Sequence, residues 1–204
     1  MLGLFKSRNP HREAATRVYG SVVTQARQPA FYTTAGVPDT MEGRFEMIVL
    51  HVAAVIDRVR ADTTSSDPLA TELVAKFVTD IDDSYREIGL SDARVPKKVK
   101  KAAAVLYDRT LQYRAIHTDA SQDVDRTTNA LADAILSNVF PDGQAAEASD
   151  DAATTATTDA QRENALRIAR YATALRRHLA DYDVSALRDG DARFPDPQGL
   201  MFSS

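Results

Sequence analysis

The residues of this chain best suited to chemistry form an acidic cluster, Asp80 to Glu87, with the sequence DIDDSYRE. Clustered carboxylates can hold Mg²⁺ together with the phosphates of a substrate. The D-x-D-D spacing also resembles a proton-donating pattern of some cyclases. One hypothesis is therefore a small metal-dependent enzyme that acts on a polyprenyl or quinone-like ligand.

The same acids have a simpler interpretation on a helix. Asp82 and Arg86 are four residues apart, so they can pair with each other, while Asp80, Asp83 and Glu87 lie on a neighbouring stripe. A second acidic motif, which an enzyme of this kind would need, is missing. We therefore favour a solvated helix face, then a partner-binding patch, and place catalysis last.

Other residues with catalytic or ligating potential give no motif. The chain has no cysteine, and its four histidines are scattered without an H-x-x-x-H pair (His11, His51, His117 and His178). His51 lies in an apolar helix, where a haem or metal ligand is conceivable but a hydrogen-bonded core histidine is the favoured interpretation. Phosphate-binding glycine motifs and nucleophile motifs do not occur. The sequence predicts no catalytic residue, no metal site and no cofactor.

Charge is unevenly spread along a chain of 204 residues with a formal net charge of −4. Residues 94–114 carry seven basic residues and one acid, whereas residues 141–160 carry five acids and no base. Four of these bases are close together, namely Lys97, Lys98, Lys100 and Lys101. They form either a solvated helix face or a contact with phosphate, in ribosomal RNA or in acidic lipid.

A capped apolar helix gives the clearest signal for the elements that position these residues. The turn GVPDT holds Gly36, which permits a positive φ, and Pro38, which restricts the residue before it. Asp39 is expected to cap the helix, with Glu42 completing a capping box. Met47 to Ile56 then has nine apolar residues interrupted only by His51. This helix is expected to be buried, and its apolar run of ten residues is too short for a bilayer, which needs about 20.

Apolar spacing elsewhere also predicts helices, over residues 13–27, 68–88, 96–116, 121–139 and 160–180. Asp67 with Pro68, and Ser121, are expected to cap two of them, and Gly89 is expected to end one. We predict an all-α, single-domain bundle of about six helices. Its segments are a loose N-terminal segment (1–12), a helical core (13–140), an acidic flexible linker (141–159), a helix packed on the core (160–182) and a loose tail (183–204).

Three segments in one order resemble a known family. YGSVVTQARQPAFY, GVPDTMEGRFEMIVLH and DIDDSYREIGLSDARVPKKVKK are similar to the ubiquinol–cytochrome c chaperone family in its bacterial form. The resemblance runs from Tyr19 to Tyr113 and continues more weakly to Ala180. It implies an all-helical assembly chaperone without catalytic residues or cofactor. Mitochondrial relatives bind newly made cytochrome b, assist assembly of ubiquinol–cytochrome c reductase (respiratory complex III), and work near the ribosomal tunnel exit with a small partner protein.

The chain departs from the family pattern in three places. Thr34-Ala35 replaces an expected aromatic residue, and the turn after the acidic helix reads REIG. The mitochondrial transit peptide and membrane-anchoring segment have no counterpart in the sequence given. We expect a cytoplasmic protein, peripheral on the inner face of the cytoplasmic membrane. The presence of the small partner protein is left open.

The resemblance and the local physics together select candidate contact residues. Those expected to bind the client or a partner are Pro29, Phe31, Tyr32, Pro38, Asp39, Arg44, Asp82, Arg86 and Glu87. Those expected to contact the ribosome or the membrane are Lys97, Lys98, Lys100 and Lys101. Gly43 is expected to allow a close helix approach, and Arg44 is predicted to pair with Asp82 or Asp83.

Overall fold

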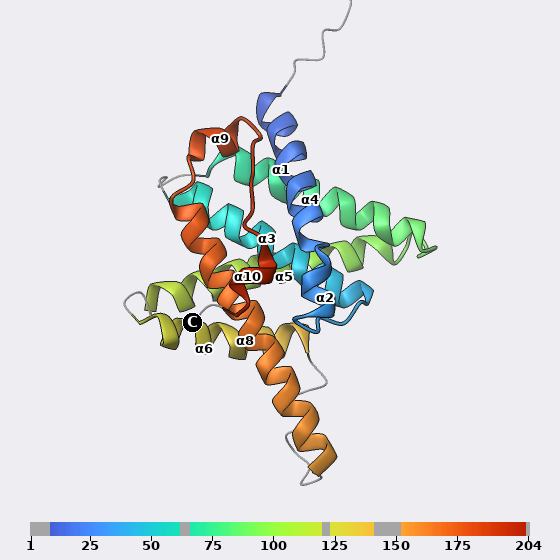
Figure 1. Cartoon of the computed structure of the whole chain (residues 1–204). Coiled ribbons are helices and arrows are strands. Elements are labelled where there is room, and N and C mark those ends of the chain that lie inside the picture. The colour runs from blue at the N-terminus through green and yellow to red at the C-terminus, as the bar shows by residue number, and fades with distance from the viewer. Residues whose placement is uncertain (1–8, 62–65, 120–122, 141–151, 203–204) are drawn as a thin grey trace, which may run out of the picture.

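A computed structural model describes residues 9–61, 66–119, 123–140 and 152–202, and within these ranges every regular element is a helix (Figure 1). The elements are α1 (Pro10–Ala26), α2 (Pro29–Thr33), α3 (Met41–Ala61), α4 (Pro68–Glu87), α5 (Val95–Asp119), α6 (Val124–Val139), α8 (Ala152–Ala180), α9 (Val184–Arg188) and α10 (Pro197–Leu200). The prediction of an all-helical fold built on six long helices is confirmed. No helix in the described ranges combines the length and apolar content needed to cross a membrane.

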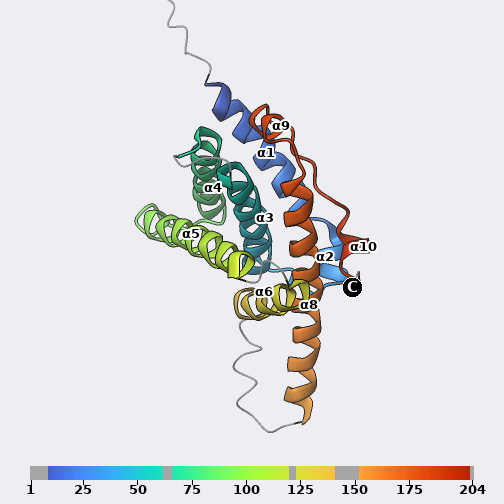
Figure 2. The same cartoon turned by 90° about the vertical axis from the view of Figure 1, so that its left-hand side faces the viewer.

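Helix α3 is the centre of the molecule. It contacts α1, α4, α5 and α8, and Figure 2 shows α4 and α5 on one side of it with α1 and α8 on the other. Nine of the ten side chains from Met47 to Ile56 are buried. A helix that is apolar nearly all round needs neighbours on every side, and this arrangement supplies them. His51 is fully buried, which confirms that it is a core histidine.

The ends of α4 follow the local sequence signals. The Asp67 carboxylate accepts hydrogen bonds from the N–H groups of Leu69 (2.8 Å) and Ala70 (3.3 Å), and Pro68 occupies the first helical position. At the other end, Gly89 adopts a φ of 80°, which glycine tolerates without steric cost. Both predicted boundaries of this helix are confirmed.

The start of α3 differs from the prediction. Its cap is Thr40, whose Oγ1 accepts a hydrogen bond of 3.1 Å from the N–H of Gly43. Asp39 instead pairs with Arg44, and Glu42 is one position too early for a capping box. A Cβ on Gly43 would lie 2.1 Å from the carbonyl oxygen of Pro38. The GVPDT turn therefore folds back so closely on the first turn of α3 that only glycine fits there.

Helix α8 begins at Ala152, eight residues before the predicted start at Ala160. Residues 152–159 lack large apolar side chains, which argues against burial, but they contain three alanines and neither Gly nor Pro, so no residue among them breaks a helix. This part of α8 projects beyond α6 in both side views (Figures 1 and 2). The rest of the predicted linker, residues 141–151, and the predicted cap Ser121 lie outside the described residues; the cap of α6 is Asp123.

The C-terminal segment packs on the bundle, so the prediction of a loose tail from its prolines is wrong. Leu187 and Met201 are fully buried. Arg188 pairs with the buried carboxylate of Asp67 at 2.9 Å, and the Arg17 guanidinium donates to the carbonyl of Asp189 at 2.6 Å. A few apolar anchors and two arginines are enough to fix a proline-rich segment. Residues 1–8, the greater part of the predicted loose N-terminus, lie outside the described residues.

Candidate binding surfaces and a polar cleft

The first group of predicted contact residues is in and beside α2. Pro29 is exposed, and Tyr32 is half-buried with its hydroxyl donating to the carbonyl of Ala26 at 2.8 Å. Phe31 is completely buried, with its ring edge-on to Tyr171 at a centroid distance of 4.9 Å. The expectation that Phe31 contacts a client is therefore corrected, because its side chain is part of the core.

The turn that follows α2 carries an exposed ion pair. Pro38, Asp39 and Arg44 are all exposed, and Arg44 Nε lies 2.6 Å from Asp39 Oδ1. The hydrogen bond from Arg44 holds the pKa of the Asp39 carboxyl below its ordinary value. Arg44 makes no ion pair with the acids of α4 in the described part of the chain, and Asp82 is bound to Arg86 instead. The predicted pairing of Arg44 with Asp82 or Asp83 is wrong.

The acids of α4 engage several different partners. Arg86 Nε lies 2.6 Å from Asp82 Oδ2, which confirms the predicted pair, and the same guanidinium also binds Asp92. Asp80 accepts a hydrogen bond of 2.9 Å from the hydroxyl of Tyr19. Burial, together with this carboxylate, raises the pKa of Tyr19. No group of three or more His, Asp or Glu side chains that could hold a metal ion occurs among the described residues.

The four lysines near the start of α5 are all exposed. None of them makes an ion pair with a carboxylate within the part of the chain that is described. Farther along the same helix, Tyr107 and Leu111 are 62% and 47% exposed. They are four residues apart and so lie on one face. The outer side of α5 thus combines unpaired positive charge with exposed apolar area.

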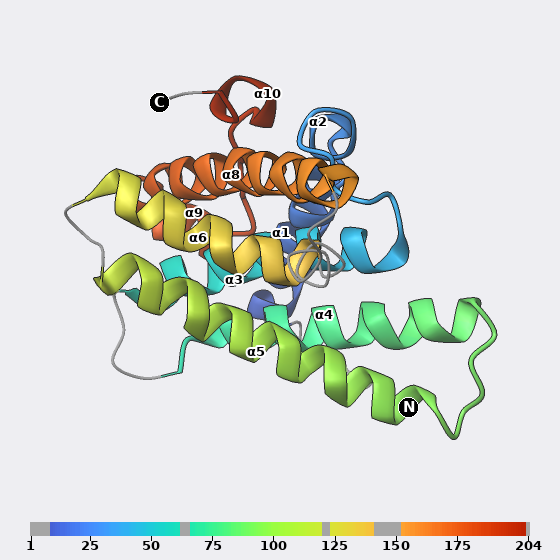
Figure 3. The same cartoon turned by 90° about the horizontal axis from the view of Figure 1, so that it is seen from below.

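The predicted residues gather on two surfaces. The hairpin surface consists of Asp82, Arg86, Glu87, Lys97, Lys98, Lys100 and Lys101, at the end of α4 and the start of α5. The turn surface consists of Pro29, Tyr32, Pro38, Asp39 and Arg44. Figure 3 shows the tip of the α4–α5 hairpin projecting from the bundle, well apart from α2.

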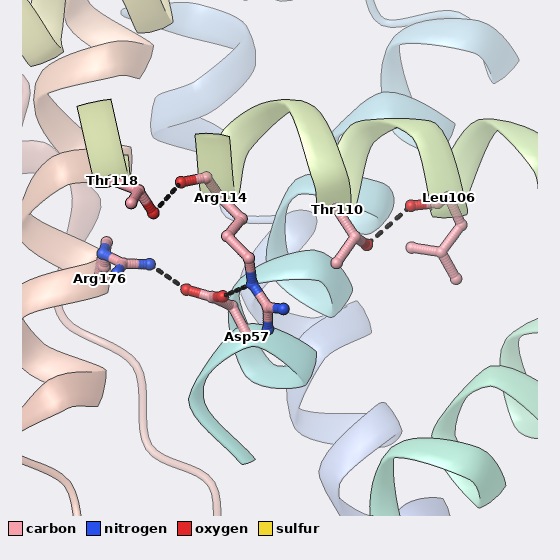
Figure 4. Close-up of polar contacts among 6 residues, drawn as sticks. All are labelled: Asp57, Leu106, Thr110, Arg114, Thr118 and Arg176. Carbon is pink, nitrogen blue, oxygen red and sulfur yellow. Dashed lines mark hydrogen bonds and ion pairs between the residues drawn. The ribbon is translucent and has the colours of Figure 1, made fainter. Parts of the chain in front are cut away.

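A third polar site was not found from the sequence. Asp57 of α3 lies between Arg114 of α5 and Arg176 of α8 (Figure 4). Arg114 Nε is 2.6 Å from one carboxylate oxygen of Asp57, and Arg176 Nη1 binds the other. The Asp57 side chain is only 19% exposed. These three residues are far apart in sequence and have no common spacing, so only the packing of three helices brings them together.

Two hollows adjoin this ion triad, and His117 and Arg176 line both. The inner one, of about 30 Å³, lies among mainly apolar side chains and has room for about two water molecules. The outer one has a volume of about 280 Å³. We call it the arginine groove; its lining includes His117, Asp123, Val124, Thr173, Arg176 and Arg177.

His117 is held in its neutral form. Burial, reinforced by the positive charge of Arg176, lowers the pKa of His117 to about 4, although Asp57 acts in the opposite direction. Both carboxylate oxygens of Asp57 are already bound by arginines. The groove therefore offers a neutral imidazole and several N–H donors, an arrangement suited to binding a ligand.

Comparison with known proteins gives two matches. A family model described as ubiquinol-cytochrome C chaperone matches residues 33–194. The crystal structure of a Cbp3 homolog from Brucella abortus is similar with a TM-score of 0.73 and 31% sequence identity, over 94% of this chain and 93% of that chain. No curated protein matches the sequence. The hairpin surface and the arginine groove both lie inside the matched range.

Proposed function

Because this chain belongs to the ubiquinol–cytochrome c chaperone family, we propose that it binds newly made cytochrome b and assists the biogenesis of ubiquinol–cytochrome c reductase. The observation that carries the proposal is the family match over residues 33–194. The architecture shared with the Cbp3 homolog supports it. The family points to a non-enzymatic assembly factor, so we assign no catalytic residue.

The physical need for such a chaperone is clear. A newly made transmembrane helix exposes apolar area, which associates with other apolar surfaces until it is covered or inserted. Tyr107 and Leu111 on α5, together with Ile88 at the end of α4, offer exposed apolar contact area of this kind. We assign client contact to this outer side of the hairpin and to the turn surface. A helical client segment would lie along α5 and cover its exposed row.

The lysines of the hairpin surface are proposed to position the protein near its client. Positive charge attracts the phosphates of ribosomal RNA and of acidic lipids alike. The protein would then act at the inner face of the cytoplasmic membrane, where nascent cytochrome b emerges.

Deletion of the gene tests the function. We expect loss of b-type haem absorbance in reduced-minus-oxidised spectra of membranes, and loss of ubiquinol–cytochrome c reductase activity. Both should return when the gene is restored. Normal spectra and normal activity in the deletion strain would overturn the chaperone assignment.

Complementation with surface variants tests the assigned contact. Leu111→Glu places a charge in the exposed row of α5 and should fail to restore activity. Gln112→Glu, one residue along the same helix and also exposed, should restore it. Both proteins should unfold within about 0.5 kcal/mol of the wild type, as surface substitutions usually do. Equal complementation by the two variants would remove α5 from the client site.

A further inference from the structure

The arginine groove is lined by polar groups that make no hydrogen bond to the described residues, and one of them is buried. The Oγ1 of Thr173 is buried without a hydrogen-bond partner among the described residues, in a side chain that is 9% exposed. Neither ring nitrogen of His117 is hydrogen-bonded within those residues, and neither is the guanidinium of Arg177. Buried polar groups are normally satisfied, so the unsatisfied hydroxyl of Thr173, a residue that lines the groove, indicates a ligand or water.

These groups are arranged to act together. Thr173, Arg176 and Arg177 follow one another at positions i, i+3 and i+4 of α8, so they share one face of the helix. His117 lines the groove from α5, and the start of α6 lines it from a third direction. A ligand in the groove would thus be contacted from three helices.

The charge of the site favours an anion. Three guanidinium groups, those of Arg114, Arg176 and Arg177, stand against the carboxylates of Asp57 and Asp123. Asp57 is shared by two of the arginines, and Asp123 accepts the backbone N–H of Arg126 at 3.0 Å as the cap of α6. Arg177 makes no ion pair with a described carboxylate, and the three guanidinium groups outnumber the two carboxylates, so the site keeps a net positive charge.

The number of donors points to the class of anion. Arginine carries five N–H donors and no acceptor, while a threonine hydroxyl and a neutral histidine can each donate one hydrogen bond. A carboxylate can accept about four hydrogen bonds on its two oxygens, which is fewer than the N–H and O–H donors that these four residues offer together. A phosphate group, with several oxygens and up to two negative charges, matches them better, and bidentate contacts from arginine are its usual recognition mode.

We propose that the arginine groove binds a phosphate group, held by Arg176, Arg177, Thr173 and His117. The group comes either from a soluble phosphate compound or from the headgroup of a phospholipid. This site is independent of the client contact assigned to α5.

Isothermal titration of the full chain with inorganic phosphate tests the site, with chloride adjusted to keep the ionic strength constant. We expect saturable binding that Arg177→Gln weakens about tenfold, as loss of a hydrogen bond to a charged group predicts. Arg27→Gln, which removes the same charge from an exposed position at the end of α1, should bind phosphate like the wild type. An equal loss in both variants, or no saturable binding, would overturn the proposal.

Thr173→Val separates binding from folding. The Thr173 hydroxyl has no partner in the described protein, so its removal should leave the unfolding midpoint unchanged or raise it. Binding of phosphate should still weaken several-fold. A variant that loses stability but keeps its phosphate affinity would contradict the proposed role.

The histidine and lipid measurements complete the test. Bound phosphate should raise the pKa of His117. NMR of the imidazole measures this pKa, and the His117→Gln variant assigns the signal. An unchanged pKa in saturating phosphate would count against the site. Vesicles of phosphatidylglycerol then identify the source. Vesicle binding that Arg177→Gln weakens and Arg27→Gln does not indicates a headgroup, whereas vesicle binding that is equal in the two variants indicates a soluble ligand.

Discussion

At the level of single residues, a chain of hydrogen bonds crosses the core. Gln25 Nε2 donates to the hydroxyl of Tyr171 at 3.0 Å, and that hydroxyl lies 2.8 Å from His51 Nε2. His51 Nδ1 lies 2.7 Å from the carbonyl of Met47, which accepts only, so Nδ1 carries the proton and Nε2 accepts from Tyr171. Gln25 also donates to the carbonyl of Pro195 at 2.8 Å. The chain links α1, α8, α3 and the C-terminal segment.

Removing the hydroxyl from this chain should be costly. Tyr171→Phe leaves His51 Nε2 without a donor inside the core, and the free energy of unfolding should fall by about 1–3 kcal/mol. Urea denaturation measures the change. Tyr107→Phe is the matched control, because the Tyr107 side chain is 62% exposed and should give no measurable effect. Similar losses in both variants would show that the buried chain contributes nothing specific.

The same histidine predicts a pH dependence. Burial lowers the pKa of His51 from 6.5 to about 4. Between these values the unfolded chain binds the proton and the folded protein does not, so acidification favours unfolding. The free energy of unfolding should be constant above about pH 6.5 and decrease below it, by up to 1.36 kcal/mol per pH unit from this group.

His51→Gln isolates the contribution of His51. Below about pH 6.5 the free energy of unfolding should fall less steeply with decreasing pH in the variant than in the wild type. The difference between the two slopes corresponds to at most one proton per molecule. His117, whose pKa is also about 4, contributes to the slope that remains. Parallel curves for the two proteins between pH 5 and about 6.5 would show that His51 titrates alike when folded and unfolded.

At the level of elements, the turn before α3 depends on one close approach. Gly43→Ala would place a methyl group 2.1 Å from the backbone oxygen of Pro38, so the turn must move. Overpacking of this kind costs about 1–3 kcal/mol. Gly20→Ala is the control within α1, where an added Cβ meets nothing within 4 Å. It should stabilise by about 0.5–1 kcal/mol, because alanine is the better helix former.

Thermal or urea unfolding of the two glycine variants should give shifts of opposite sign. If Gly43→Ala were as stable as Gly20→Ala, the turn would be loosely packed on α3. The turn surface would then lack the rigid support that the structure gives it.

Elements with local signals could be predicted from the sequence, and those set by long-range packing could not. The apolar residues of α3, the Asp67–Pro68 start of α4 and its end at Gly89 each depend on a few neighbouring residues. The burial of Phe31 depends on Tyr171, more than a hundred residues away, and the ion triad around Asp57 depends on α5 and α8. The predicted hairpin surface was found because its residues adjoin one turn.

At the level of the whole molecule, the exposed lysines and the exposed apolar side chains of α5 lie apart from the contacts that hold the bundle together. The C-terminal segment closes one side of the bundle through the pairs Arg188–Asp67 and Gln25–Pro195. The α4–α5 hairpin projects freely from another (Figure 3). The exposed lysines are at this projecting end, in a chain whose formal net charge is −4. Anionic partners should therefore meet the protein through the hairpin first, since the remainder of the chain is acidic overall.

Removal of charge from the hairpin should weaken binding to anionic partners in a salt-dependent way. We expect the double variant Lys100→Gln with Lys101→Gln to bind ribosomes or phosphatidylglycerol vesicles less well, and the loss to be largest at low salt. Salt screens the attraction between charges, and the screening length falls to about 10 Å at 0.1 M. Arg12→Gln with Arg27→Gln removes two exposed charges from α1 and should have little effect. Sedimentation at low and high salt measures both. An association that is independent of salt, or equally weakened by both double variants, would exclude the lysines as the contact. A loss confined to the lysine variant and to low salt would identify the hairpin as the part of the molecule that first meets a charged surface.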